Sequence, residues 1–222
     1  EWVWALRYYM SMRISRAEWY NITQQGYDIA KRVSDANKQA NMLKALGDVA
    51  RITYRFEVAR ENYEQALQIY VQIGERREVA YTLKACGDVE GMAEQYDSAR
   101  SYYEQALLIH EEVENRLGVA YTLRALGNIK IRTREYDSAQ TLLARALLIF
   151  ETLQDQEGMA HTLRSLAELA SVTDLRAVAR NYLERAFPIY ESTGNRSGTA
   201  RTLQAMGELA QSTQLYTDAV TY

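Results

Sequence analysis

Residues 80–109, AYTLKACGDVEGMAEQYDSARSYYEQALLI, decide the fold, because residues 120–149 repeat them as AYTLRALGNIKIRTREYDSAQTLLARALLI. The same 40-residue offset extends through most of the chain. Six columns share it, and they contain Ala40, Ala80, Ala120, Ala160 and Ala200; Leu43, Leu83, Leu123, Leu163 and Leu203; Gly47, Gly87, Gly127, Ala167 and Gly207; Ala59, Ala99, Ala139, Ala179 and Ala219; Ala66, Ala106, Ala146 and Ala186; and Ile69, Ile109, Ile149 and Ile189. A fixed period of about 20–50 residues is typical of stacked repeats rather than of one globular core.

Each repeat is predicted to form two helices. In the unit 78–117, apolar and small residues recur at helical spacing from Ala80 to Gly87, which predicts a first helix over about 78–93. A break follows near residues 94–95. A second periodic segment begins at Tyr96 and should end near Val113, with Asp97 in its first turn, where the helix dipole favours a carboxylate.

Small residues at fixed places indicate where the two helices approach each other. Gly87 and Ala99 lack bulk, and a glycine inside a helix costs up to about 1 kcal/mol relative to alanine, so its recurrence predicts a close contact. Gly74 and Gly194 stand where a second helix should end, which suits left-handed termination. Aromatic side chains are expected to fill the corner between the helices, and they are Phe56, Tyr96, Tyr136 and Tyr216.

This pattern resembles the tetratricopeptide repeat, on the spacing of Leu83, Gly87, Tyr96, Ala99, Tyr103 and Ala106. The resemblance implies an all-α fold, a right-handed α–α superhelix of antiparallel helix pairs. The period is 40 rather than the family's usual 34, and the proline that usually closes the second helix is absent. We expect one solenoid over residues 1–222, divided into a divergent repeat 1–37, repeats 38–77, 78–117 and 118–157, a degenerate repeat 158–197 and a partial repeat 198–222.

Forty-residue versions resemble those of Pins-type polarity scaffolds and of bacterial signal-transduction ATPases of the NB-ARC (STAND) class. The segments Asn115-Arg116-Leu117-Gly118 and Asn195-Arg196-Ser197-Gly198 are closer to the ATPase group. There the repeats act as a sensor or partner-binding arm. The resemblance therefore implies a signalling role for this chain.

The ends and the fourth full unit depart from the pattern. Residues 1–37 keep the register loosely and concentrate three tryptophans, Trp2, Trp4 and Trp19. In unit 158–197, Arg176 replaces the corner aromatic. Pro188 lies inside the second helix, where it should kink or end that helix.

Composition excludes several classes of function. Net charge is −3 without a long run of like charge, whereas general nucleic-acid binding needs a concentrated basic face. No apolar run approaches the ~20 residues of a membrane span. The single cysteine, Cys86, shares a column with Leu46 and Leu126, so we interpret it as a small buried hydrophobe rather than a reactive thiol. We expect a reducing, cytoplasmic location.

Catalysis is not expected either. With two histidines and one cysteine, the usual zinc and cysteine–histidine sites are hard to assemble. Walker, H-E-x-x-H and G-x-S-x-G motifs are absent from the sequence. We therefore predict no catalytic residue, no metal ligand and no cofactor.

The family resemblance places peptide ligands on the concave wall formed by the first helix of each pair. In that family the second, fifth, ninth and twelfth consensus positions of those helices carry most contacts, and the twelfth is mixed in this sequence. The second position holds Asn41, Tyr81, Tyr121, His161 and Arg201, the fifth Lys44, Lys84, Arg124, Arg164 and Gln204, and the ninth Asp48, Asp88, Asn128, Glu168 and Glu208.

Two interpretations of these positions stay open. The four successive cations at the fifth position form a stripe suited to an acidic peptide, or each pairs with the acid four residues later, an interaction worth ~0.2–0.5 kcal/mol. Arg124 with Asn128 is the least neutralised pair and so the best candidate contact. Tyr81 and Tyr121 flank the stripe as interface anchors or stack on a neighbouring helix. His161 either senses pH or is incidental.

The predicted partner-binding residues are thus Lys44, Asp48, Tyr81, Lys84, Asp88, Tyr121, Arg124, Asn128, His161, Arg164 and Arg201. The predicted function is a protein- or peptide-binding module. Its partner would be a protein or peptide, possibly acidic, with no nucleic acid and no membrane. The alternatives are a free-standing scaffold and a sensor of a small anionic ligand. We expect a monomer, or a weak dimer through the solenoid ends.

Overall fold

The computed structural model describes the backbone of residues 16–220 and the side chains of residues 18–211. This part of the chain is helical and divides into two compact units, with the boundary between Val113 and Glu114. The predictions about Trp2 and Trp4 lie outside the described residues.

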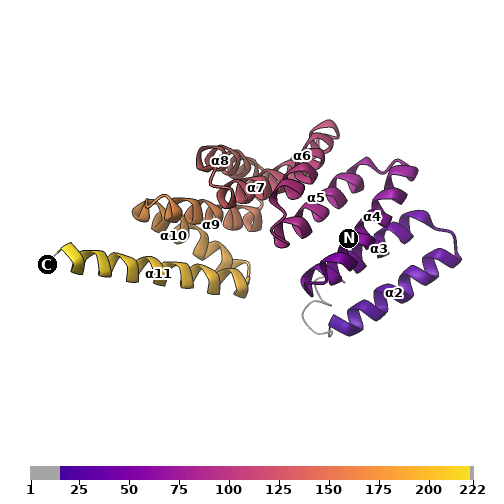
Figure 1. The fold of residues 1–222 in the computed structure, drawn as a ribbon, viewed down its shortest axis with the longest axis horizontal. Coiled ribbons are helices and arrows are strands. Elements are labelled where there is room, and N and C mark those ends of the chain that lie inside the picture. Colours follow the sequence, from indigo (N-terminus) through magenta and orange to yellow (C-terminus); the bar gives the residue numbers. More distant parts are fainter. Residues whose placement is uncertain (1–15, 221–222) are drawn as a thin grey trace. The chain divides into compact units, whose positions relative to one another are not determined.

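The first unit contains α2 (Arg16–Arg32), α3 (Ala36–Ile52), α4 (Phe56–Ile73), α5 (Arg76–Met92) and α6 (Tyr96–Glu112). The second contains α7 (Arg116–Arg132), α8 (Tyr136–Leu153), α9 (Gln156–Val172), α10 (Arg176–Ser192) and α11 (Arg196–Val220). The most extensive contacts join α3 to α4, α5 to α6, α7 to α8 and α9 to α10 (Figure 1). We call α3, α5, α7, α9 and α11 helices A, and α2, α4, α6, α8 and α10 helices B. The predicted all-α architecture of tetratricopeptide-type helix pairs is confirmed.

The helix ends share one backbone feature, which recurs every 20 residues, half the repeat length. Each helix from α2 to α10 is followed by a residue in the left-handed region, with φ between 51° and 78°. These residues recur every 20 positions and are Ser34, Tyr54, Gly74, Glu94, Glu114, Arg134, Gln154, Asp174 and Gly194. At the end of α5, the N–H of Gln95 then donates to the carbonyl of Glu90 at 2.8 Å, as in a Schellman motif. The predicted left-handed termination at Gly74 and Gly194 is confirmed.

The core of each unit is built from the repeating columns. The alanines at the helix contacts, Ala59 and Ala99 in the first unit and Ala139 and Ala179 in the second, are fully buried. The glycine column fits closely against helix B: a Cβ built on Gly87 would lie 2.6 Å from Cε1 of Tyr103. The predicted close approach of helices A and B is therefore confirmed.

Glycines at the start of helices A serve a second contact. Asn115 and Asn195 accept from the N–H of Gly118 and Gly198, at 3.1 and 2.9 Å, as N-caps. A Cβ on Gly198 would lie 2.3 Å from Cδ1 of Tyr190, the aromatic residue near the end of α10. The Asn-Arg-x-Gly segments thus have a local structural role in capping and packing.

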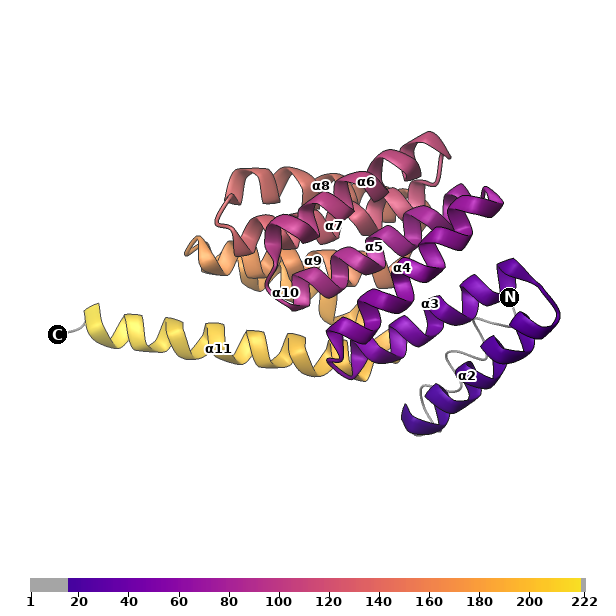
Figure 2. The ribbon, with the colours of Figure 1, turned by 45° about the vertical axis from the view of Figure 1, so that its right-hand side comes forward.

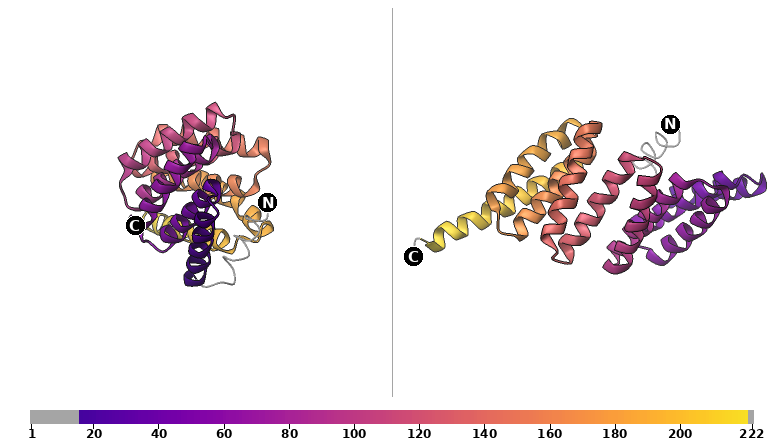
Figure 3. Two further views of the ribbon diagram at one scale, coloured as in Figure 1. Left: turned by 90° about the vertical axis from the view of Figure 1, so that its right-hand side faces the viewer. Right: turned by 90° about the horizontal axis from the view of Figure 1, so that it is seen from above.

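Two expectations near the end of the chain are not met as stated. Pro188 was expected to kink or end its helix; α10 does not end there but runs on to Ser192, and the kink stays a prediction. Pro188 lies on the exposed side of the helix, where water can hydrate the carbonyl that loses its N–H partner. No corner forms at Tyr216, because α11 continues to Val220 (Figures 1 and 3).

The fifth helix A shows why that corner is missing. In α11, Ala200 and Leu203 are exposed although their columns are buried elsewhere, and nothing described lies within 4 Å of a Cβ built on Gly207. A helix-pair turn is held by packing of the two helices of the pair. The helices that pack on the described part of α11 are α9 and α10, which belong to the preceding pair, and α11 continues as helix to Val220. Figure 2 shows α11 as the longest ribbon, with its C-terminal end extending beyond α10.

Candidate partner-binding face

The A-helix face is defined by the second, fifth and ninth positions of helices A. In the first unit its lysines are already neutralised. Lys84 Nζ lies 2.9 and 2.7 Å from the two carboxylate oxygens of Asp88, four residues later. Lys44 instead reaches across to Glu78 of α5, at 2.9 Å. Intrahelical pairing therefore describes Lys84 but not Lys44.

The ninth-position acids of the first unit also have partners from helix B. The hydroxyl of Tyr63 donates to Asp48 at 2.8 Å, and that of Tyr103 donates to Asp88 at 2.9 Å. Burial acts to raise the pKa of Asp88, but Lys84 and Arg51 outweigh it and hold the pKa below its usual value. The sequence indicated Tyr103 only as a position of the repeat. The recurrence of a tyrosine 15 residues after the acid was the signal that could have linked it to the face.

Aromatic residues at the second position pack edge-on against a ring near the end of the following helix B. Ring centroids lie 4.8 Å apart for Tyr81 and His110, 4.9 Å for Tyr121 and Phe150, and 5.2 Å for His161 and Tyr190. Asn41 continues the series by accepting from the Tyr70 hydroxyl at 2.9 Å. Of the two interpretations of Tyr81 and Tyr121, stacking on a neighbouring helix is therefore what the structure shows.

The second unit differs, because three arginines from three helices A lie near enough to one histidine to act on its charge. Arg124 of α7, Arg164 of α9 and Arg201 of α11 all disfavour the charged form of His161. Burial is the largest cause and the three guanidiniums follow, together lowering the pKa of His161 to about 4. The ring stays neutral at pH 7, with Nδ1 2.8 Å from the Tyr190 hydroxyl.

Several other groups face this cluster. The Arg124 guanidinium lies over the Tyr121 ring, 5.7 Å from its centroid, and the Tyr121 hydroxyl donates to Asp155 at 3.0 Å. Glu157 lies 3.7 Å from Nε2 of His161. Within the described part of this unit, Arg164 and Arg201 form no ion pair with a carboxylate. The structure therefore brings Arg124, His161, Arg164 and Arg201 of the predicted set together, with Tyr121 beside them.

Asn128 shows how the two units diverge. Its Oδ1 is buried without a hydrogen-bond partner among the described residues. The position facing it holds Leu143, where the first unit has a tyrosine that donates to the equivalent acid. Asn128 lacks a hydroxyl donor because helix B carries a leucine at the facing position, and the sequence of helix A alone does not reveal this.

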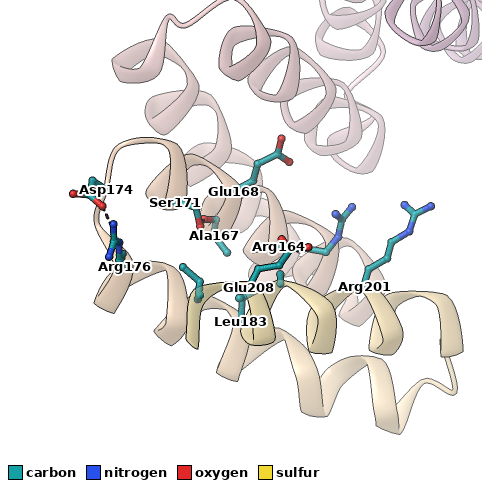
Figure 4. Close-up of a pocket in the computed structure, with 11 residues that line it drawn as sticks. Arg164, Ala167, Glu168, Ser171, Asp174, Arg176, Leu183, Arg201 and Glu208 are labelled. Carbon is teal, nitrogen blue, oxygen red and sulfur yellow. Dashed lines mark hydrogen bonds and ion pairs between the residues drawn. The ribbon is translucent and has the colours of Figure 1, made fainter. Parts of the chain in front are cut away.

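A pocket of about 420 Å³ opens on this face between α9, α10 and α11 (Figure 4). Arg164 and Arg201 project side by side at one edge, and Glu168 and Glu208 also line it. Other lining residues are Ala167, Ser171, Asp174, Arg176, Leu183, Ala205 and Leu209. An apolar base with charged groups at the mouth is typical of ligand pockets.

Other kinds of site are less well supported. Burial raises the pKa of the Cys86 thiol to about 12, so it carries almost no thiolate at neutral pH. Among residues 18–211, no group of three or more His, Cys, Asp and Glu side chains is arranged to hold a metal ion. None of the described helices is long and apolar enough to span a membrane.

The family profile of the tetratricopeptide repeat matches residues 38–112, 78–152 and 118–192 in overlapping segments, which together cover more than half of the chain. The chain belongs to the tetratricopeptide repeat family. No curated protein sequence matches it.

Solved structures with the same fold share little sequence with this tetratricopeptide repeat protein. Apo RapI is 18% identical with a TM-score of 0.78, covering 96% of this chain and 79% of its own. BtubC (BKLC) from P. vanneervenii is 16% identical with a TM-score of 0.69, covering 90% and 92%. A Rap protein complexed with Competence and Sporulation Factor is 18% identical with a TM-score of 0.63, covering 86% and 59%. At these identities the likeness shows the fold alone.

Proposed function

We propose that this chain is a non-catalytic module that binds a protein or peptide bearing carboxylates, and that the A-helix face of the second unit holds it. The observation that carries the proposal is that Arg164 and Arg201 project side by side at one edge of the pocket, with Arg124 acting on the same histidine as they do. Guanidinium groups match carboxylates in shape and charge. A similar fold in complex with Competence and Sporulation Factor supports a ligand-binding role for such a scaffold.

The contrast between the units narrows the proposal. Lys44 and Lys84 each lie within 3 Å of a carboxylate of their own chain, so an acidic ligand would have to displace it. Arg164 and Arg201 need no such exchange. We therefore assign the main electrostatic contacts to the second unit, with Lys44, Asp48, Tyr81, Lys84 and Asp88 in a supporting role.

The test is affinity capture from the source cell with two variants of equal charge. The first removes the A-face cations by Arg124→Gln, Arg164→Gln and Arg201→Gln. The second removes three exposed cations from α8 and α10 by Arg145→Gln, Arg180→Gln and Arg185→Gln. A protein held by the wild type and the second variant, but released by the first, supports the proposal. Equal capture by all three refutes it.

Salt provides an independent readout. Exposed charge pairs are screened over about 8 Å at physiological ionic strength, so the captured protein should elute as salt rises. Retention at high salt would point instead to an apolar contact.

A narrower version makes the chain the sensor arm of a larger signalling ATPase. Its support is the resemblance of the Asn-Arg-x-Gly segments at 115–118 and 195–198 to such arms. A phosphate-binding P-loop encoded upstream would support it, whereas a different upstream domain would favour a free-standing scaffold.

The arginine cluster also favours a second candidate, a sensor of a small anionic ligand. Citrate and phosphate would then raise the unfolding temperature of the wild type and not of the A-face variant. We propose a cytoplasmic location, with which a free cysteine agrees.

A further inference from the structure

The pocket between α9, α10 and α11 occupies the place of a tyrosine ring. In the first unit, Tyr63 of α4 enters the space between α3 and α5. It packs there with Ala85 and Val89. A Cβ on Gly47 would lie 2.5 Å from its Cε1, and its hydroxyl bonds to Asp48 at 2.8 Å. Tyr103 makes the same contacts with Gly87 and Asp88.

Forty-residue offsets map this arrangement onto the second unit. The residues that correspond to Gly47, Asp48, Tyr63, Ala85 and Val89, shifted by 120 positions, are Ala167, Glu168, Leu183, Ala205 and Leu209, and all five line the pocket. Leucine lacks the ring and the hydroxyl, although the Ala167 methyl takes up part of the room that glycine leaves open for the ring. The room that remains opens as the pocket of about 420 Å³.

We propose that this pocket takes an aromatic side chain, tyrosine above all, from an acidic peptide segment. The inference rests on the proposed function and specifies its ligand. The base formed by Ala167, Leu183, Ala205 and Leu209 suits an aromatic face, and Glu168 can accept from a phenol hydroxyl as Asp48 accepts from Tyr63. An aromatic side chain buries about 150–250 Å², enough to act as an anchor.

The charged side chains at the mouth of the pocket determine which residues can flank the aromatic residue in the bound peptide. Arg164 and Arg201 stand together at one edge, so a carboxylate beside the aromatic residue would meet both guanidiniums (Figure 4). Glu168 and Glu208 oppose a carboxylate elsewhere at the mouth and favour a neutral hydroxyl there. The ligand is thus a Tyr flanked by Asp or Glu, and a Lys or Arg neighbour is disfavoured by the arginines.

The experiment is selection of a random dodecapeptide phage library on the full chain and on two variants. Ala167→Gly/Leu183→Tyr rebuilds the Gly87–Tyr103 pair and fills the pocket from within. Arg164→Gln/Arg201→Gln keeps the pocket and removes the two arginines at its edge, while Arg176, which is paired with Asp174, stays. Because a buried tyrosine is demanding, Ala205→Leu provides a second block that leaves the α9–α10 contact unchanged. Circular dichroism is used to check that each variant is folded.

We expect peptides with an acidic-flanked Tyr or Phe on the wild type. The filled and blocked variants should lose the aromatic preference, and the arginine variant should lose the acidic one. In fluorescence polarisation with the best peptide, replacing its aromatic residue by Ala should weaken binding at least tenfold on the wild type and less than twofold on the filled variant.

Failure of this inference is distinguishable from failure of the proposed function. Acidic peptides without an aromatic residue, lost only on Arg164→Gln/Arg201→Gln, would overturn the pocket and leave the acidic-ligand function standing. An aromatic preference that survives in both the filled and the blocked variant would overturn the pocket as its location. Enrichment of no peptide, or of peptides indifferent to the arginines, would overturn both.

Discussion

Replacing Gly87 by alanine tests why glycine recurs every 40 residues. The new Cβ would lie 2.6, 2.7 and 3.0 Å from Cε1, Cδ1 and Cζ of Tyr103, closer than carbon atoms pack. The ring cannot move aside cheaply, because Tyr103 is buried and its hydroxyl is bonded to Asp88 at 2.9 Å. Gly207 is the matched control, since nothing described lies within 4 Å of its Cβ.

The two substitutions should affect the free energy of unfolding differently. Overpacking costs about 1–3 kcal/mol, and a displaced Tyr103 hydroxyl adds about 1 kcal/mol for the lost hydrogen bond. Alanine returns up to about 1 kcal/mol of helix propensity at either site. We therefore expect Gly87→Ala to lower the free energy of unfolding by about 1–3 kcal/mol, and Gly207→Ala to be neutral or stabilising by up to about 1 kcal/mol.

Urea unfolding followed by far-UV circular dichroism measures both effects. A rescue sharpens the test: Gly87→Ala/Tyr103→Leu recreates the Ala167–Leu183 pair of the second unit, so the substitutions should couple by about 0.5–3 kcal/mol. If Gly87→Ala were harmless, or cost no more than Gly207→Ala, close packing would not explain the glycine column.

Three further predictions concern single groups. Burial is the main cause that lowers the pKa of His110 to about 4. The unfolded chain therefore binds a proton at this histidine before the folded chain does, and the free energy of unfolding declines as pH falls from 6.5 to 4. His110→Phe, which copies the equivalent Phe150, should remove on the order of 1–3 kcal/mol of that decline, measured by urea unfolding at pH 7 and at pH 4.5. An acid response unchanged in the variant would contradict this. Gly74→Ala meets no atom within 4 Å but must hold φ near 78°, so calorimetry should show a loss of about 0.5–1 kcal/mol, and no loss would disprove the conformational cause. Tyr63→Phe leaves buried Asp48 without its hydroxyl donor and should cost about 1–2 kcal/mol in urea unfolding; a neutral result would mean that the bond contributes nothing net.

Local patterns predicted the helices well because the same spacing of apolar and small residues recurs in successive repeats. Tyr96 begins α6 as expected, and Val113 caps it after Glu112. Helix A of the same pair begins at Arg76, two residues before the expected start, because capping depends on the geometry of the preceding turn. Tyr54 and Glu94 adopt the left-handed conformation although they are not glycines, so the sequence did not mark these positions individually.

The candidate site was predicted less completely, because its residues were taken from helices A alone. The stripe of cations was correctly located on one set of helices, yet it divides into two different environments. Lys84 pairs within its helix, Lys44 pairs with a residue 34 positions away, and three arginines surround His161. Which outcome occurs at each step depends on side chains contributed by other helices.

By itself, the sequence determined the period, the helix pairs and the places where small residues let helices touch, since all of these follow from local spacing and residue volume. Only the tertiary structure decided which charges are neutralised and where a space remains. A charge pair forms when two flexible side chains from different elements come within about 4 Å. Leu183 lines the pocket at the position where the first unit has Tyr63, and a leucine fills less space than a tyrosine; this difference in volume matters only once α9, α10 and α11 surround it.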